Sequence, residues 1–306
     1  MVREGFSPMN VLVSGASGLI GREVCSLLSA KGHGVRHLVR SASAMRPGDV
    51  VWNPGQPLDP ALLAGCDAIL HLAGRNVGTY WTDEARREIL DSRVLGTRSL
   101  AQAAAHAYRE TGAPRAMICA SAIGYYGSRG DEPLTEESEG GLGFLADVCN
   151  QWEEAALPAA MAGVRVAHLR TSIVLSPEGG ALAKMLPAFK MGVAGKLGSG
   201  HQWWSWVSLR DAARAYVFAL ENEHAHGALN LAAASATNAE FTRTLGRVLH
   251  RPTFLAVPAF ALRLVGGDMA EEMLLASQKV LPHRLLELGF TFDDPELEAA
   301  LRGLLQ

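Results

Sequence analysis

A glycine-rich turn near the N-terminus is the strongest constraint on this 306-residue chain. The turn Gly15–Gly21 follows the apolar run Val11–Val13 and leads into a helical pattern. This order of strand, turn and helix is typical of a dinucleotide-binding crossover. Gly15 permits a tight turn, Gly18 leaves room for a pyrophosphate, and Gly21 lets the helix pack closely on the sheet. A glycine turn without a ligand is the alternative. The predicted cofactor contacts in the turn are Gly15, Ala16, Ser17, Gly18, Leu19, Ile20 and Gly21.

The end of the next expected strand indicates which dinucleotide is bound. Gly34–Arg40 is the expected second strand, about 20 residues beyond the turn. Chains that bind NAD usually carry Asp or Glu at this end to hold the ribose hydroxyls, whereas this chain carries Arg40 and Ser41. A guanidinium binds a phosphate through two parallel hydrogen bonds, and an acid would repel it. These residues favour NADP(H), with a solvated strand-end charge as the alternative role for Arg40.

Expected strands and helices alternate through the first half of the chain. Strand patterns at Asp67–Gly74, Met117–Ser121 and Val164–Arg170 accompany a long helical stretch, Thr82–Ala107. The alternation predicts an α/β fold with a doubly wound, parallel, Rossmann-type sheet. Ligands bind such sheets at the carboxyl ends of the strands. The residues expected to contact the cofactor at these ends are Leu72, Ala73, Gly74, Ser121 and Ile173.

The second half of the chain has a different character. Residues 177–200 are rich in glycine, and the pattern from Asn238 onward is mostly helical and interrupted by prolines. We expect residues 9–175 to form the dinucleotide-binding domain, with segments returning to it at about 201–235. Residues 176–306 are expected to form a small, largely helical lobe for the substrate.

The segment Gln202–Val207 contains three tryptophans in four positions. Aromatic side chains commonly line pockets for small molecules. We therefore predict a substrate pocket lined by His201, Gln202, Trp203 and Trp206. The alternative is that the tryptophans fill the seam between the sheet and the lobe. His201 is also a candidate acid/base group, because the unperturbed pKa of histidine is near neutrality.

Composition argues against several other classes of protein. The chain has 28 Lys and Arg against 31 Asp and Glu, a net charge of −3 that does not favour a nucleic-acid-binding surface. No apolar run is long enough to span a membrane. The cysteines lack metal-ligand spacing, and we expect reduced, buried thiols in a cytoplasmic protein. The expected partners are a small-molecule substrate and, in an oligomer, further copies of the chain. The four cysteines are Cys25, Cys66, Cys119 and Cys149.

Further motifs resemble those of extended short-chain dehydrogenases/reductases. They are His71–Gly74, Arg93–Thr97, Ala120–Ser121 with Tyr126–Gly127, and Trp206–Val207 with Asp211–Ala215. More narrowly, the chain resembles the atypical NAD-dependent epimerase/dehydratase family that is often labelled cell-division-inhibitor-like. The narrower matches are Phe144–Cys149 with Trp152–Glu153, Gly198–Gln202, Asn238–Phe241, Arg251–Pro252, Gln278–Pro282 and Gly289–Phe290. The resemblance implies a nucleotide-sugar-epimerase-like fold, bound NADP and Arg93 as a cofactor contact; a solvent-facing helix charge is the alternative for Arg93.

The chain departs from ordinary short-chain dehydrogenases/reductases at the residues that transfer protons. Ordinary members carry Tyr-x-x-x-Lys, in which the lysine lowers the pKa of the tyrosine so that its phenol exchanges a proton with the substrate. When Glu153 is used as the anchor, these positions hold Leu145 and Cys149, and a shift by one residue restores neither. The usual serine position falls at Ser121 or at Ala122.

Hydroxyl groups near this strand end are the remaining candidates for a catalytic acid. They belong to Ser121, Tyr125 and Tyr126, and a structural loop at Tyr126–Gly127 is the alternative. A tyrosine near Arg93 or Lys184 is expected to have a lowered pKa. We therefore expect an NADP(H)-binding protein, epimerase-like or oxidoreductase-like, that acts on a small molecule through a non-standard active site. The alternative is a catalytically weak protein that senses NADP(H) or scaffolds a partner.

Overall fold

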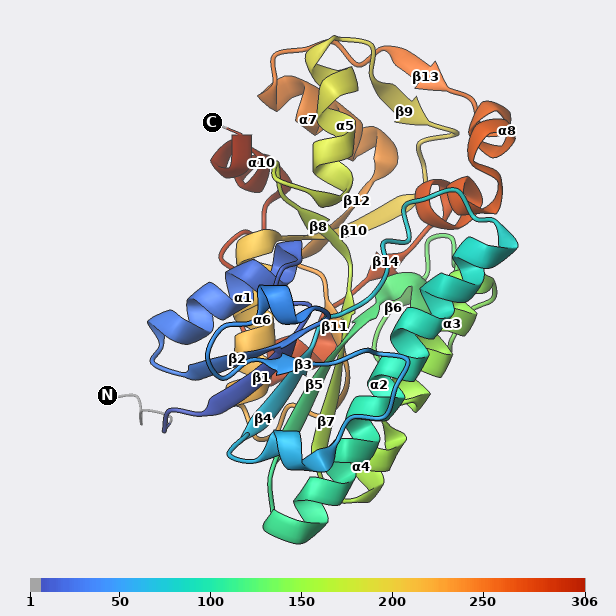
Figure 1. The fold of residues 1–306 in the computed structure, drawn as a ribbon. Helices are drawn as coiled ribbons and strands as arrows, with labels where there is room; N and C mark the ends of the chain where they lie inside the picture. The colour runs from blue at the N-terminus through green and yellow to red at the C-terminus, as the bar shows by residue number, and fades with distance from the viewer. Residues whose placement is uncertain (1–6, 306) are drawn as a thin grey trace.

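A seven-stranded parallel sheet organises the computed structural model, which describes residues 7–305 (Figure 1). The strand order is β11-β7-β5-β4-β1-β2-β3, and every neighbouring pair is parallel. The predicted doubly wound Rossmann-type sheet is therefore confirmed. The strands are β1 (Asn10–Ser14), β2 (Gly34–Val39), β3 (Val50–Val51), β4 (Ala68–His71), β5 (Ala116–Ala122), β7 (Arg165–Thr171) and β11 (Gly227–Leu231).

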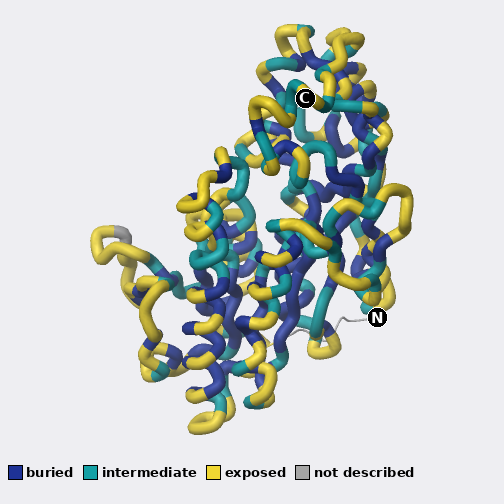
Figure 2. Tube along the Cα trace, turned by 90° about the vertical axis from the view of Figure 1, so that its right-hand side faces the viewer, coloured by how far each residue is buried: buried dark blue, intermediate teal, exposed yellow. Residues whose placement is uncertain are grey.

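Helices cover both faces of the sheet. On one face α1 (Leu19–Ala30) packs beside α6 (Leu209–Glu221), and on the other α2 (Asp83–Thr111) packs beside α3 (Phe144–Glu154) and α4 (Leu157–Met161). Buried residues run through the centre of the molecule (Figure 2). No helix within residues 7–305 is long and apolar enough to cross a membrane. Short 3₁₀ turns lie in the loops at η1 (Ala42–Ala44), η2 (Pro60–Leu63) and η3 (Ile123–Tyr126).

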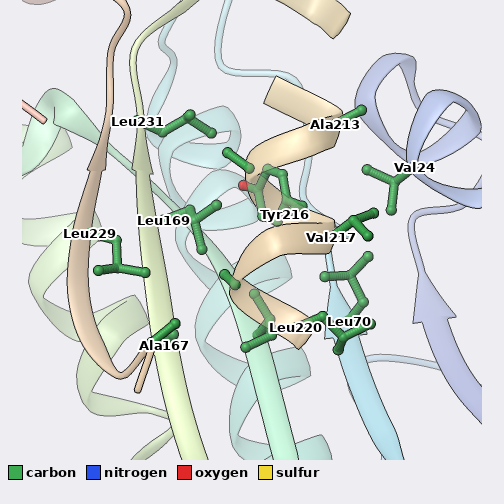
Figure 3. Packing of buried hydrophobic residues seen from close by; sticks show 14 of the residues in the cluster. Val24, Leu70, Ala167, Leu169, Ala213, Tyr216, Val217, Leu220, Leu229 and Leu231 are labelled. Carbon is green, nitrogen blue, oxygen red and sulfur yellow. The ribbon is translucent and has the colours of Figure 1, made fainter. Parts of the chain in front are cut away.

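The core beneath α6 shows why the sheet reads as apolar in the sequence. Tyr216, Val217 and Leu220 of α6 pack against Leu169 and Leu229, which lie on neighbouring strands (Figure 3). All five side chains are buried. Strands covered on both faces carry near-continuous apolar residues, as this sheet does.

Local signals set the ends of the long helix α2. The Thr82 side chain accepts a hydrogen bond from the Ala85 amide at the start of the helix. Gly112 ends the helix in a left-handed conformation, with φ at 73°. The helix therefore continues four residues beyond Ala107, where the expected helix ended.

A smaller region follows β7 and lies beyond the carboxyl edge of the main sheet (Figure 1). Its own sheet consists of β8 (Ile173–Leu175), β10 (Trp203–Ser208) and β12 (Ala234–Thr237). Its helices are α5 (Gly180–Lys190), α7 (Asn238–Val248), α8 (Ala259–Ala270), the π-helical turn η4 (Glu271–Leu275) and α10 (Leu297–Leu305). The short helix α9 (His283–Glu287) instead packs against β11 of the main sheet. Two strand pairs complete the description, β9 (Gly195–Leu197) with β13 (Leu255–Val257) and β6 (Pro133–Leu134) with β14 (Lys279–Val280). The expected helical C-terminal region is confirmed, with short strands in addition.

The tryptophan-rich segment and its neighbours divide between the two sheets. Trp203, Trp204 and Trp206 lie on β10, so the segment that we treated as a loop is a strand of the smaller sheet. Within the stretch 201–235, α6 and β11 lie on the main sheet. The chain thus crosses from the smaller region back to the main sheet after β10.

Candidate functional site

The glycine turn lies where β1 ends, beside the carboxyl end of β4. Gly15 has φ at 72°, and a Cβ on it would lie 2.7 Å from the carbonyl carbon of Leu72. A Cβ on Gly21 would lie 2.1 Å from the Gly15 carbonyl oxygen, so the helix and the turn touch at this point. A Cβ on Gly18 would meet only that oxygen, at 3.2 Å. Gly15 and Gly21 therefore fix the turn, while a side chain on Gly18 would be crowded by this one backbone oxygen alone.

Helix α1 begins without the usual partners for its first amides. Its N-cap, Gly18, makes no side-chain hydrogen bond, and its first turn carries no acidic residue. The first N–H groups of a helix need an acceptor, and the helix dipole favours a negative one. Phosphates bind at helix N-termini for this reason. The turn and the start of α1 therefore fit the pyrophosphate of a dinucleotide.

The end of β2 presents a cation and two hydroxyls. Arg40 is exposed one residue beyond β2, and no acidic side chain within residues 7–305 pairs with it. The Ser41 hydroxyl lies 2.8 Å from the Ser43 hydroxyl and accepts from the Ser43 amide. The carboxylate of Asp49 is already engaged, because it accepts from the His37 amide at 2.9 Å. This arrangement fits a 2′-phosphate. Ser43 was not among the predicted contacts, and the only sign of it in the sequence is its place in the same turn as Ser41.

A buried histidine ties the end of β4 to β1. The Ser14 hydroxyl lies 2.6 Å from His71 Nδ1 and accepts from the Ala73 amide at 3.3 Å. Burial, and next the charge of Arg93, lowers the pKa of His71 from its ordinary value to about 4. His71 is therefore neutral at pH 7. The pair holds the predicted contacts Leu72, Ala73 and Gly74 against the glycine turn.

Arg93 points from α2 toward these strand ends. Its guanidinium donates to the backbone oxygens of Ile89 and Arg75, at 3.0 and 2.9 Å. Its Cζ lies 5.0 Å from the ring centroid of Trp152 and 3.3 Å from where a Cβ on Gly74 would be. Burial lowers the pKa of Arg93, and no carboxylate within residues 7–305 pairs with it. The solvent-facing alternative for Arg93 is therefore wrong, because the side chain is a partly buried cation beside the cofactor edge.

The positions aligned with the family tyrosine and lysine lie together against η3. A Cβ on Gly124 would lie 3.2 Å from Leu145 Cβ and 3.7 Å from Cys149 Sγ. Burial, and next the charge of Glu153, raises the pKa of Cys149 to about 12, which Arg93 only partly offsets. Neither residue supplies a proton near neutral pH. We call Gly124, Leu145, Cys149 and Arg93 the reaction end of the site.

Ser121 and Tyr126 belong to a buried hydrogen-bond network beside the reaction end. The Ser121 hydroxyl donates to Glu153 at 2.6 Å, and Arg170 donates to both oxygens of that carboxylate at 2.9 Å. Arg170 also donates to the Tyr126 oxygen at 3.0 Å, and the Tyr126 hydroxyl donates to Asn230 at 2.7 Å. Burial raises the pKa of Tyr126 to about 12 despite the charge of Arg170. The expectation of a lowered tyrosine pKa is therefore wrong for Tyr126.

Tyr125 differs from these two residues, because its hydroxyl has no hydrogen-bond partner within the described chain. Its ring centroid lies 3.4 Å from the guanidinium carbon of Arg170 and 5.1 Å from the ring centroid of Tyr126. The side chain is partly exposed. Ring packing thus holds the phenol in place, with its Cζ 3.3 Å from where a Cβ on Gly140 would lie, and its proton is not donated to another residue that the structure describes.

The predicted pocket residues of the second half have separate surroundings. His201 is exposed, and the buried Gln202 amide donates to two backbone carbonyls. The Trp203 indole donates to Asp131 at 2.8 Å. Trp206 is fully buried in the core of the smaller region. Trp206 thus packs inside the smaller region rather than in a seam between it and the main sheet, and a pocket role for the other three residues stays a prediction.

Residues from the smaller region also reach the site. Ile173 begins β8 and pairs in register with Trp206, and Lys184 Nζ donates to the Gly78 carbonyl at 3.0 Å. Glu272, which was not among the predicted residues, accepts hydrogen bonds from the first amides of α3. These contacts span 127 and 128 residues. The one local hint was that α3 starts after Gly143, without a capping side chain of its own.

The buried histidine gives a test of the cofactor edge through pH. Unfolded His71 has its ordinary pKa of about 6.5, so between pH 6.5 and 4 the unfolded state binds a proton that the folded state does not. The free energy of unfolding therefore falls as the pH drops through this window, by about 2–3 kcal/mol from this residue near pH 4.5. His71→Gln removes that contribution. Urea unfolding of both proteins at pH 7 and at about pH 4.5 measures it, and an identical pH dependence in the two proteins would contradict the assignment.

Comparison with known proteins gives two family matches. The model of the "NAD dependent epimerase/dehydratase family" matches residues 11–232. The model of the "Domain of unknown function (DUF1731)" matches residues 257–304. The first match covers the glycine turn, both faces of the main sheet and the reaction end. The second covers α8, η4 and the remainder of the chain to α10.

Similar proteins match the chain over nearly its whole length. Epimerase family protein Mb2239 of Mycobacterium bovis is 40% identical over 294 residues, which are 95% of this chain and 96% of that protein. The crystal structure of human epimerase family protein SDR39U1 (isoform2) with NADPH has a TM-score of 0.87 and 36% identity, and covers 97% of this chain and 99% of that one. The nucleoside-diphosphate sugar epimerase of Corynebacterium glutamicum has a TM-score of 0.80 and 36% identity, over 98% of this chain and 58% of that one.

Proposed function

The chain belongs to the NAD dependent epimerase/dehydratase family, and on that premise we propose that it is an NADP(H)-dependent oxidoreductase or epimerase of a small organic molecule. The observation that carries the proposal is the glycine turn at the end of β1 together with Arg40 at the end of β2. No acidic side chain within residues 7–305 pairs with Arg40. The presence of NADPH in the crystal structure of the human relative supports the choice of cofactor.

The chain's own residues divide the cofactor between them. The backbone of the glycine turn and the start of α1 would hold the pyrophosphate. Arg40, Ser41 and Ser43 would hold the 2′-phosphate, because a guanidinium and two hydroxyls match its oxygens. Arg93 would lie at the nicotinamide end, where its charge takes the place of the family lysine. Bound NADP(H) supplies the hydride donor or acceptor.

The proton that is exchanged with the substrate has to come from a group other than Leu145 or Cys149. Three hydroxyls are predicted near this strand end. Those of Ser121 and Tyr126 already donate hydrogen bonds to Glu153 and Asn230. We therefore assign proton transfer to Tyr125, whose hydroxyl is free within residues 7–305 and whose ring rests on Arg170. A general acid must have its proton available to the substrate, and this residue alone among the three does.

The first test concerns the 2′-phosphate. Arg40→Ala removes charge-assisted hydrogen bonds of about 1.5–3 kcal/mol each, so we expect NADPH to bind about 10- to 100-fold more weakly. NADH has no 2′-phosphate, and its affinity is expected to stay nearly unchanged. Calorimetric titration of both cofactors against both proteins measures this difference. Equal losses for NADPH and NADH would sink the assignment of Arg40.

The second test concerns the phosphate turn. Gly18 has an ordinary extended backbone, with φ at −72°, and its Cβ in Gly18→Val would lie 3.2 Å from the Gly15 carbonyl oxygen, so the turn has to shift slightly to accept it. The valine side chain would occupy the space in front of the turn and is expected to abolish NADPH binding. Circular dichroism establishes that the variant is folded, and calorimetry measures binding. A folded variant with normal NADPH affinity would rule out this binding mode.

The third test compares two adjacent tyrosines. Tyr125→Phe is expected to lower kcat about 10²-fold or more with no change of fold, because it removes the acid. Tyr126→Phe is expected to leave kcat within a few-fold and to lower the free energy of unfolding by about 1–3 kcal/mol, because it leaves buried partners unsatisfied. NADPH oxidation with a panel of carbonyl and nucleotide-sugar substrates, together with urea unfolding, measures both. The reverse pattern would transfer the role to Tyr126.

The apolar reaction end favours a second candidate function. With Leu145 and Cys149 at the tyrosine and lysine positions, the protein would bind NADP(H) without turning it over and would act as a sensor or scaffold. The same substrate panel separates the two functions. Tight NADPH binding with no oxidation across the panel favours the sensor, and turnover that depends on Tyr125 favours the enzyme.

A further inference from the structure

The segment formed by α8 and η4 lies over the reaction end. In Figure 1, α8 and the turn that follows it lie beside the N-terminal end of α2. Met269 and Met273 pack against the buried apolar side chains of Trp81, Ile89 and Val148, and Phe144 and Leu145 pack against the same cluster. Leu145 holds the position of the family tyrosine, which places this segment directly against the reaction end.

Polar contacts of three residues hold the segment in place. The Leu274 carbonyl accepts from Gln202 Nε2 at 3.2 Å and from Trp204 Nε1 at 3.3 Å, which fixes the end of η4. The Glu272 carboxylate accepts from the Phe144 amide at 2.9 Å and from the Leu145 amide at 2.8 Å, at the start of α3. The Asp268 carboxylate pairs with Arg86 at 2.6 Å, and the Asp268 side chain is 72% exposed. A carboxylate at a helix N-terminus is stabilised by free amides and by the dipole, whereas an exposed ion pair contributes little. Glu272 is therefore the main polar attachment.

Apolar packing of the same segment is sparse. No residue of η4 is buried, and Leu264 and Val265 of α8 are 85% and 77% exposed. Gly267 interrupts α8 with φ at 54° and ψ at −140°, a backbone conformation available mainly to glycine. Beyond η4 the chain is fixed again, because Gln278 donates to two carbonyls of the loop that contains η3. π-Helical turns are rare and frequent at functional sites, and segments with few buried contacts open most readily.

From these contacts we propose that residues 268–275 form a lid over the reaction end, closed in this structure and held shut by Glu272 on the N-terminus of α3. The lid opens between the break at Gly267 and the anchored carbonyl of Leu274, and its opening uncovers Leu145. This assigns a role to part of the region that matches the domain of unknown function. The role of the lid in admitting substrate rests on the proposed function, whereas the latch itself does not.

Hydrogen exchange of the full chain without added cofactor tests the latch. Glu272→Ala is expected to raise the exchange of residues 268–275 about tenfold and to leave β1, β4 and β5 unchanged. Glu271→Ala is the matched control, because Glu271 is the preceding carboxylate and pairs with Arg263 on the exposed side. The control is expected to exchange like the unmodified protein. Glu272→Gln keeps an acceptor oxygen without the charge and is expected to give an intermediate effect.

The outcomes separate a lid from a structural cap. Unchanged exchange of residues 268–275 in Glu272→Ala would overturn the proposal. So would faster exchange that spreads through α3 and the main sheet together with a lower Tm, because Glu272 would then only stabilise α3.

The NADPH dissociation rate then places the lid over the site. It is expected to rise several-fold in Glu272→Ala and not in Glu271→Ala. A segment that opens without altering NADPH dissociation would overturn its placement over the reaction end. A protein that binds no NADPH at all would refute the proposed function and leave the exchange result intact.

Discussion

The close approach of α1 to the turn that precedes it is the constraint on which the rest of the site depends. A Cβ at Gly21 would collide with the Gly15 carbonyl, so the helix can start only where it does because that position has no side chain. The first amides of α1 consequently face the carboxyl edge of the sheet. The same turn lies against Leu72, which Ser14 and His71 hold in place. The phosphate site and the edge of β4 are therefore one rigid unit.

In this chain helix α3 does not carry the proton-transferring tyrosine and lysine that ordinary short-chain dehydrogenases/reductases have there. The face that would carry the tyrosine and lysine carries Leu145 and Cys149, and one turn further along the same face lies Glu153, which is ion-paired with Arg170 inside the protein. A buried ion pair is costly to desolvate unless further hydrogen bonds satisfy it, and Ser121 and Tyr126 supply these bonds. The helix thus contributes a polar network that fixes η3 and thereby the position of Tyr125. In the proposed function, the chemistry at the reaction end therefore depends on the side chains that η3 carries, Tyr125 among them.

The sequence predicts the local parts of this site and misses the parts that distant segments build. The glycine turn, the alternation of strands and helices and the start of α2 near Thr82 depend on neighbouring residues, so pattern and spacing suffice. The bond of Tyr126 to Asn230 spans 104 residues, and that of Arg170 to Tyr126 spans 44. No periodicity encodes such pairs, so Tyr126 resembled a catalytic tyrosine, and a solvent-facing charge stayed open as the alternative to the predicted cofactor contact for Arg93. Trp206 was ambiguous for the same reason, because only the packed smaller region shows that it is core.

The C-terminal region shapes the reaction end from two directions at once. Glu272 holds the start of α3, and six residues later Gln278 holds the carbonyls of Ile123 and Gly127 on either side of Tyr125. In the proposed function the glycine turn and Arg40 serve only the cofactor. Differences in what proteins of this fold act on must then come from groups that touch the reaction end. Residues 268–278 touch it through Glu272 and Gln278 and lie outside the glycine turn and Arg40, so the region of unknown function is where we expect substrate choice in this chain to be encoded.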